Sequence, residues 1–212
     1  MKLRASVLVM MMLLILACVS PAQVWACACC ADDGEYGISF SRPSAYQLGL
    51  LKQIQFSQTA TLFTNAAGFE AVRGLVNPKE SYALNGSFAG GLWNLVFRDG
   101  KLPGTLNLRL PARMLSYRAD IHDQQTGGGG GPLLYKEWRF EGQVNGAGFF
   151  QRGFAAPVKY FLVLQGRGNN CDNAGDFTHW RLEITGRKAA YAFFGELAKL
   201  GPESSGDQGA KP

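Results

Sequence analysis

The chain has 212 residues, of which 47% are hydrophobic and 17% charged, and it carries a formal charge of +5 at pH 7. This length fits one domain, large enough to bury about two thirds of its unfolded surface. The basic residues are scattered along the chain and the net charge is small, which argues against the basic patch of a nucleic-acid-binding protein.

The first 26 residues resemble an export signal. Lys2 and Arg4 precede an apolar run over residues 5–17, and small residues follow it. A charged start, an apolar centre and a small-residue exit are the three parts of a secretory signal peptide. The run is shorter than the about 20 apolar residues of a membrane-spanning helix, and Pro21 follows it. We therefore predict a protein exported to the periplasm, the cell envelope or the medium, with no transmembrane segment after cleavage.

The sequence allows more than one cleavage site for the signal peptide. Small residues allow cleavage after Ala22, Ala26 or Ala28, so the mature chain is expected to begin near Cys27. Attachment of a lipid to Cys18 is an alternative, but Leu16 is bulky for its position two residues before that cysteine. Loss of the two basic leader residues lowers the formal charge to +3.

Short strand-like segments follow one another through the rest of the chain, and in several of them apolar and polar residues alternate. Alternation with period two predicts strands with one buried and one solvated face, as in antiparallel sheets. The predicted strands cover residues 36–40, 53–63, 82–88, 93–98, 105–110, 115–121, 137–141, 158–164, 177–185 and 189–194. We therefore predict an all-β fold, an antiparallel β-barrel or two-sheet β-sandwich of about eight to ten short strands with little helix.

Two segments stand outside this pattern. Residues 124–132 contain five consecutive glycines and predict a flexible loop. Residues 201–212 are polar, lack apolar periodicity and predict a disordered tail. Residues 27–200 are then a single domain. Within it, residues 189–194 also have helical spacing, but Gly195 would cost about 1 kcal/mol inside a helix, so we predict a strand there.

Four cysteines remain after removal of the leader. Cys27, Cys29 and Cys30 lie together at the start, and Cys171 lies in a polar loop between two predicted strands. Disulfides are the first expectation for an exported chain. A bridge between the neighbours Cys29 and Cys30 would be strained, so we predict that Cys171 pairs with one of them. The alternative is a copper(I) or zinc site on Cys27, Cys29 and Cys30; no histidine accompanies them, and we predict no metal or other cofactor.

The loop around Cys171 also carries the residue types of a cysteine hydrolase. That chemistry needs a thiolate, a base and an orienting acid, for which Cys171, His179 and Asp176 are the candidates. Asn and Asp are also common in turns, so a turn accounts for these residues without catalysis, and a cysteine in a disulfide has no thiolate. We therefore assign no catalytic residue and keep the hydrolase as the alternative hypothesis.

Gly91-Leu92-Trp93 resembles the Gly-x-Trp found near the beginning of lipocalins, over three residues, and no function is carried over from it. In a barrel, the inward aromatic side chains would either line an apolar ligand cavity or fill a solid core. These candidates are Trp93, Phe97, Trp138, Phe140, Tyr160 and Trp180. We predict an exported, non-enzymatic binding or interaction domain, whose partner is a small apolar ligand or an envelope protein. The alternative is a hydrolase or a metal and redox protein.

Overall fold

The computed structural model describes residues 29–64, 68–100, 102–127 and 130–199. The predicted signal peptide and the predicted tail lie outside the described residues. The strands are β1 (Tyr36–Ser41), β2 (Thr59–Leu62), β3 (Ser81–Ala89), β4 (Leu92–Arg98), β5 (Pro103–Arg109), β6 (Met114–Ala119), β7 (Leu134–Gly148), β8 (Val158–Gly168), β9 (Phe177–Gly186) and β10 (Ala190–Glu196). The helical elements are α2 (Ala45–Gln53) and two 3-10 turns, η1 (Phe69–Ala71) and η2 (Ala174–Asp176). None of the helices in these ranges is long and apolar enough to cross a bilayer.

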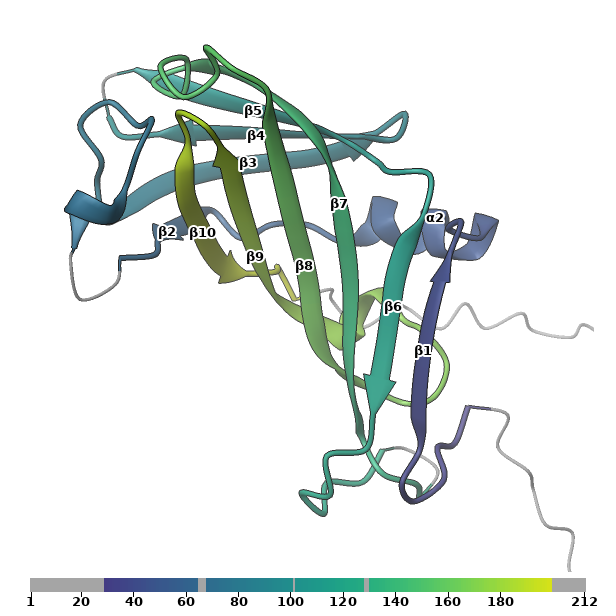
Figure 1. The fold of residues 1–212 in the computed structure, drawn as a ribbon. Coiled ribbons are helices and arrows are strands. Elements are labelled where there is room, and N and C mark those ends of the chain that lie inside the picture. The colour runs from purple at the N-terminus through teal and green to yellow at the C-terminus, as the bar shows by residue number, and fades with distance from the viewer. Residues whose placement is uncertain (1–28, 65–67, 101, 128–129, 200–212) are drawn as a thin grey trace, which may run out of the picture.

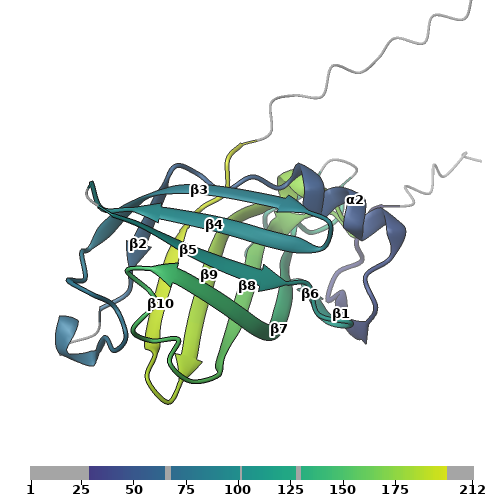
Figure 2. The same cartoon turned by 90° about the horizontal axis from the view of Figure 1, so that it is seen from above.

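Eight of the strands close into an antiparallel barrel in the order β2-β3-β4-β5-β7-β8-β9-β10. Each barrel strand pairs with the next along the chain, and β10 pairs with β2 through Phe193 and Leu62 to complete the ring. Figure 2 shows β3, β4 and β5 crossing over β8, β9 and β10 on the opposite side of the barrel. The all-β prediction is confirmed, and of the two predicted architectures the barrel is the one that forms.

The strands β5 and β6 follow one another along the same edge of β7. Leu108 of β5 is opposite Val144, and Leu115 of β6 is opposite Arg139. The chain therefore uses two more residues on the β5–β6 side than on the β7 side between these two pairs. An insertion of this kind is a large β-bulge, which bends a strand away from its neighbour. Pro111, which has no N–H for a ladder, lies inside it.

Beyond this bend the long strands continue out of the barrel as an open sheet. We call it the wing and define it as β1, β6, residues 134–140 of β7 and residues 162–168 of β8. Figure 1 shows the wing extending from the barrel, with β1 as its outermost strand. The wing has two faces and a free edge, whereas the closed part of the sheet has only an inside and an outside.

The barrel interior is filled by alternate residues of its strands. Along β4, the side chains of Trp93, Leu95 and Phe97 are buried, whereas Leu92 and Arg98 are exposed. These buried residues belong to one continuous hydrophobic cluster. Burial of such a cluster is the main favourable term in folding, so packing inside the barrel is a main source of the stability of the molecule.

The helix α2 is an element that period-two reasoning missed. The predicted strand over residues 53–63 is in fact limited to Thr59–Leu62, and the helix ends at Gln53. Ser44 Oγ accepts a hydrogen bond from the Gln47 N–H at 3.1 Å, and the Ser44 N–H donates to Gln47 Oε1 at 3.1 Å. This reciprocal pair is a capping box, which starts a helix. The Ser-x-x-Gln spacing was therefore a readable helix signal.

Candidate binding site

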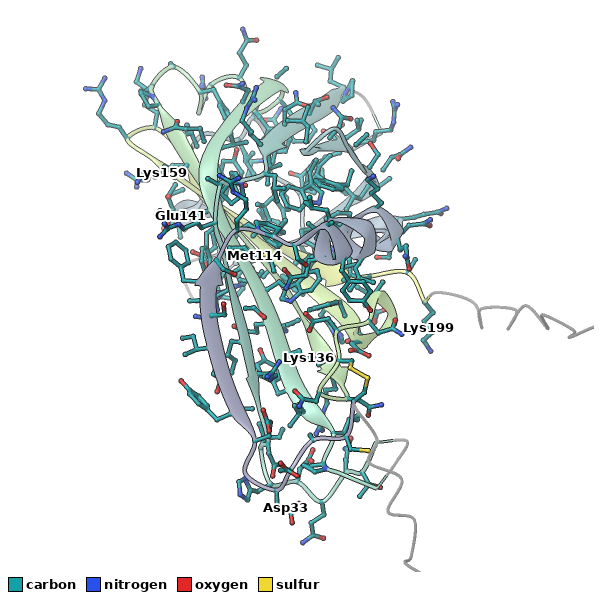
Figure 3. The ribbon with its side chains drawn as sticks, turned by 90° about the vertical axis from the view of Figure 1, so that its right-hand side faces the viewer. Asp33, Met114, Lys136, Glu141, Lys159 and Lys199 are labelled. Atoms are coloured by element: carbon teal, nitrogen blue, oxygen red, sulfur yellow. A yellow bond between two sulfur atoms is a disulfide. The ribbon has the colours of Figure 1, made fainter. Side chains whose placement is uncertain are left out.

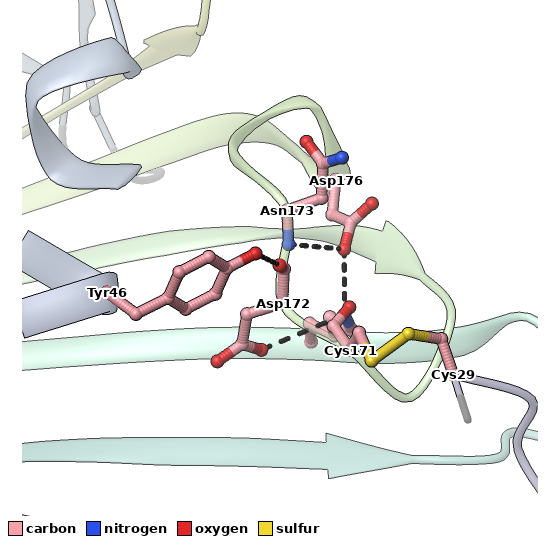
Figure 4. Close-up of a disulfide and its surroundings, with 7 residues drawn as sticks. Cys29, Tyr46, Cys171, Asp172, Asn173 and Asp176 are labelled. Atoms are coloured by element: carbon pink, nitrogen blue, oxygen red, sulfur yellow. Dashed lines mark hydrogen bonds and ion pairs between the residues drawn. A yellow bond between two sulfur atoms is a disulfide. The ribbon is translucent and has the colours of Figure 1, made fainter. Parts of the chain in front are cut away.

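A disulfide fastens the first described residues to the loop between β8 and η2. Cys29 and Cys171 are joined although they are 142 residues apart, and this is one of the two pairings expected from the sequence. Asn170 N–H donates to the Cys29 carbonyl at 2.9 Å beside the bridge. Figure 4 shows Tyr46 of α2 reaching the same loop, where its hydroxyl donates to the Asp172 carbonyl at 2.6 Å. The loop thus joins the N-terminal segment, α2 and the wing. Cys27 lies outside the described residues.

A buried lysine of β7 binds the side of this loop that faces the sheet. Lys136 of β7 is 1% exposed, and its Nζ donates to the Cys171 carbonyl at 2.6 Å and to Asp176 Oδ2 at 2.7 Å. Burial, which outweighs the contacts with Lys136, raises the pKa of the Asp176 carboxyl above its ordinary value of 3.8. Charged groups are buried only when they are paired and hydrogen-bonded. The arrangement therefore holds the loop on the sheet, with the Lys136 ammonium group engaged by the Asp176 carboxylate and the Cys171 carbonyl.

Two glycines of β8 allow the loop to lie directly on the strand. A Cβ at Gly166 would be 1.8 Å from the Asp176 carbonyl oxygen, and a Cβ at Gly168 would be 2.1 Å from the Asp176 carboxyl group. No other residue type fits at these distances without moving the loop. The two glycines let the polar loop pack closely on β8, and the disulfide and Lys136 hold it there. These residues therefore have a structural role.

The hydrolase candidates do not assemble into a catalytic group. The Cys171 sulfur is bonded to Cys29, Asp176 binds Lys136, and His179 is exposed on β9 with its Nδ1 2.9 Å from Thr178 Oγ1. A cysteine nucleophile needs a free thiolate, which the bridged Cys171 does not have. Within the described ranges, no three His, Cys, Asp or Glu side chains come together as a metal site.

The six aromatic residues predicted to face inward all lie in the core cluster. Each is at most 1% exposed: Trp93, Phe97, Trp138, Phe140, Tyr160 and Trp180. The rings of Trp93 and Phe140 are in edge contact at 5.0 Å, and the Tyr160 hydroxyl donates to the Arg109 carbonyl at 2.5 Å. Their rings therefore pack against protein groups, and none of the six lines the surface groove described below.

An exposed apolar row runs along β1 on the outer face of the wing. Tyr36, Ile38 and Phe40 are 63%, 59% and 64% exposed, and they share one face because they alternate along the strand. The Tyr36 ring contacts Tyr117 of β6 edge-on at 5.7 Å. Contiguous exposed apolar side chains on a folded domain mark interaction sites. The row therefore identifies this face as a candidate binding surface.

The bulge between β5 and β6 opens a groove beside this row. The groove has a volume of about 620 Å³, which lies within the range of ligand-binding clefts, about 300–1,000 Å³. Its apolar lining includes Phe40, Leu115 and Phe161. Its charged lining consists of three cations and one carboxylate: Arg113, Arg139, Lys159 and Glu141. Strand register places Leu115, Arg139 and Phe161 on the same face as the exposed row. The row and the groove form one surface, which we call the outer wing surface.

The cations of the groove differ in how far they are neutralised. Arg139 Nε donates to Glu137 Oε2 at 2.5 Å, and Lys159 Nζ is 3.7 Å from Glu141 Oε1. Arg113 instead lies over the Phe40 ring, 5.8 Å from its centroid, and it has no ion pair within the described part of the chain. The groove therefore offers a positive charge next to apolar surface.

Tyr135 supports the ion pair at the edge of this groove. Its hydroxyl donates to Glu137, the carboxylate that also binds Arg139. Burial, followed by the hydrogen bond with Glu137, raises the pKa of Tyr135 above its ordinary value of 10.0. The hydroxyl of Tyr135 thus donates to the carboxylate that binds Arg139, and this hydrogen bond orients the Glu137–Arg139 pair.

Comparison with protein-family models, with curated proteins and with solved structures found no match for this chain. The resemblance of Gly91-Leu92-Trp93 to lipocalins gains no support from these comparisons. Trp93 lies in β4, the third strand of the barrel, and packs in its core. Because one barrel fold can carry many functions, the function must be argued from the surface.

Sequence reasoning missed the outer wing surface. Residues 36–40 were predicted as a strand of a sheet with one buried face, and the strand forms, but none of its residues is buried and its apolar side chains are exposed. Pro111 was the available signal for the break between β5 and β6, since proline interrupts a strand ladder. No local signal indicated that Lys136 would be buried.

Proposed function

We propose that the protein is an exported, non-enzymatic binding domain, and that its groove at the bulge takes a small ligand with an apolar body and an acidic group. One observation carries the proposal: Arg113 lines a groove of ligand size together with apolar side chains, and it has no ion pair in the described residues. The disulfide supports export, because such bridges persist in oxidising compartments.

Each part of the groove has a defined role in this proposal. The apolar body of the ligand packs on Phe40, Leu115 and Phe161, and its acidic group lies near Arg113. A guanidinium is suited to this role because it stacks on an aromatic ring and still presents hydrogen-bond donors to an anion. The groove is open to solvent on the outer face, so we expect a dissociation constant of about 1 to 100 µM.

A dye with the same chemistry tests the groove. Anilinonaphthalene sulfonate combines aromatic rings with a sulfonate, and its fluorescence rises in an apolar environment. We expect the double variant Arg113→Gln/Phe161→Ser to weaken dye binding at least about tenfold, equivalent to about 1.4 kcal/mol. The matched control is Arg152→Gln/Leu102→Ser, which removes an exposed cation and an exposed apolar residue elsewhere. Equal dye binding by both double variants would count against the proposal.

Export is tested separately from ligand binding. Expression of the full chain with its own leader should release a mature protein whose N-terminus lies near Cys27, because the charged start, apolar centre and small-residue exit form a signal peptide. N-terminal sequencing or intact mass measures this directly. A secreted or periplasmic product that still begins at Met1 would contradict cleavage, and a lipid on Cys18 would identify a lipoprotein.

A further inference from the structure

We propose that β1 is the contact strand of a homodimer, in which the β1 strands of two copies pair antiparallel across a two-fold axis. The two wings would then form one continuous sheet. This proposal does not need the groove to be occupied, because it depends on the backbone edge of β1, its apolar row and the charges at its two ends, although Phe40 belongs to both the row and the groove. A small ligand in the groove and a second copy on β1 are different occupants of neighbouring sites.

The first step is the free edge of β1. This strand is the last in the ten-stranded sheet, and no strand of the described residues pairs with its second side. Figure 3 shows it as the outermost ribbon of the wing. Natural edge strands are protected by charged residues, proline or bulges. The six residues Tyr36–Ser41 contain no charge and no proline, and their pairing with β6 is regular, so this edge is suited to strand addition.

The second step is the direction of the backbone groups. Asp120 N–H donates to the Glu35 carbonyl at 2.8 Å, one position before the pair Tyr36 and Ala119. Hydrogen-bonded and non-hydrogen-bonded pairs alternate along an antiparallel ladder. The backbone N–H and C=O groups of every second residue, counted from Glu35, therefore point toward β6. The N–H and C=O groups of Tyr36, Ile38 and Phe40 therefore point to the free edge. These are the same residues that carry the exposed apolar row.

The third step is the register. If Ile38 pairs with Ile38 of the second copy, Tyr36 lies opposite Phe40 of the second copy, and the reverse holds across the axis. The three residues whose backbone groups point to the free edge then all lie in hydrogen-bonded pairs, and each apolar side chain lies opposite an apolar side chain of the second copy. A shift of one residue would place the two rows on opposite faces of the sheet. A shift of two would place Phe40 opposite Gly34, or Tyr36 opposite Arg42.

The fourth step is charge complementarity. Asp32 and Asp33 precede β1 and Arg42 follows it, and none of the three has an ion pair within the described part of the chain. Figure 3 labels Asp33 at the start of the strand. An antiparallel pairing brings the acidic start of each strand to the basic end of the other, whereas a parallel pairing would place like charges together. Opposite charges across an interface fix its orientation.

The contact closes and is small. A two-fold pairing uses the only β1 of each copy, so it ends at a dimer and does not continue into a fibre. One six-residue strand buries less than the about 1,200 Å² of a standard stable interface. We therefore expect a dimer that dissociates on dilution.

Sedimentation velocity of the mature protein between about 5 and 500 µM tests the proposal. The wild type should shift from monomer to dimer over this range. Ile38→Pro removes an outward N–H and leaves the ladder to β6 intact, so it should raise the dimer dissociation constant at least tenfold, with circular dichroism confirming the fold. Ile38→Val is the matched control and should dimerise like the wild type. A monomer at all concentrations, a larger oligomer, or an Ile38→Pro variant that dimerises normally would overturn the proposal.

Charge reversal provides a test that does not use proline. Arg42→Glu and Asp33→Lys should each weaken the dimer several-fold, and the double variant should restore it, because the reversed charges again face each other across the axis. Amide hydrogen exchange gives the residue-level readout. Tyr36, Ile38 and Phe40 should gain protection as the protein concentration rises, whereas Gly37 and Ser39 should be protected at all concentrations. Loss of dimerisation in the double variant, or protection that does not alternate, would refute the register.

Discussion

The barrel and the wing share two long strands, β7 and β8, but they are stabilised in different ways. Inside the barrel, Phe97 is surrounded by other apolar side chains. On the wing, Lys136 forms a buried ion pair and Cys171 a disulfide, while Phe40 is left exposed. A closed sheet excludes water from its interior by packing alone. An open sheet has a second face and an edge. The inner face of the wing still adds Trp138 and Leu164 to the hydrophobic cluster, but polar and covalent contacts hold the loop against the wing, and the apolar side chains of β1 remain exposed.

The largest contrast is expected between two phenylalanines. Phe97→Ala should lower the free energy of unfolding by about 3 to 5 kcal/mol, because it creates a cavity in the packed barrel. Phe40→Ala should change it by no more than about 0.5 kcal/mol, because this ring is 64% exposed. Chemical denaturation of both variants makes the comparison. Equal losses would show that the wing row is part of the stabilising core.

The ion pair beneath the loop should come next. Lys136→Met should lower the free energy of unfolding by about 3 kcal/mol, because it leaves the largely buried Asp176 without its cation. The double variant Lys136→Met/Asp176→Leu should recover part of this loss, since no unpaired charge then remains. Urea unfolding of the single and double variants gives the coupling. A single variant as stable as the wild type would mean that the loop contributes nothing to the stability of the wing.

The disulfide should contribute about 2 to 4 kcal/mol, because it restricts an unfolded chain over 142 residues of sequence separation. Cys171→Ser should therefore lower the melting temperature of the oxidised protein and have little effect on protein that is already reduced. Differential scanning calorimetry with and without reductant measures both. If the oxidised variant melts with the wild type, the bridge is not a staple. Peptide mapping that found Cys171 alkylated in the folded, unreduced protein would exclude the bridge and return the hydrolase hypothesis.

The smallest effect is expected at the far end of the wing. The Arg167 guanidinium, which donates to Asp123 Oδ1 at 2.9 Å, holds the pKa of that carboxyl at about 2, below its ordinary 3.8. A lowered pKa in the folded state stabilises the protein above pH 3.8, and this contribution is lost as the pH falls through about 2. Acid titration should thus destabilise the wild type more than Asp123→Asn over this window. Parallel acid-unfolding curves would contradict this.

Local chemistry explains what could be predicted from the sequence. The alternation in Trp93–Arg98 and in Phe177–Thr185 predicted strands, because the side-chain period of a strand depends on neighbouring residues alone. Gly195 likewise favoured a strand for the last segment, and the structure has β10 there. The candidate partner cysteines for Cys171 followed from the same kind of reasoning. The Ser44 capping box was equally local and equally readable.

Tertiary structure decided which faces are buried and which contacts form. Tyr36–Phe40 alternates as Trp93–Phe97 does, yet the first row is exposed and the second is buried, because burial depends on what packs against a strand and not on its own pattern. Long-range contacts also decide that Lys136 is buried, since its partners in the loop lie about 35 to 40 residues away. They likewise decide that Cys171 pairs with Cys29 and not with Cys30. Closure through β10 and β2, and the bend at Pro111 that opens the groove, are also long-range outcomes. The periodicity of the sequence by itself determined the strands, and only the folding of the sheet decided where the protein has a core and where it has a surface that can bind.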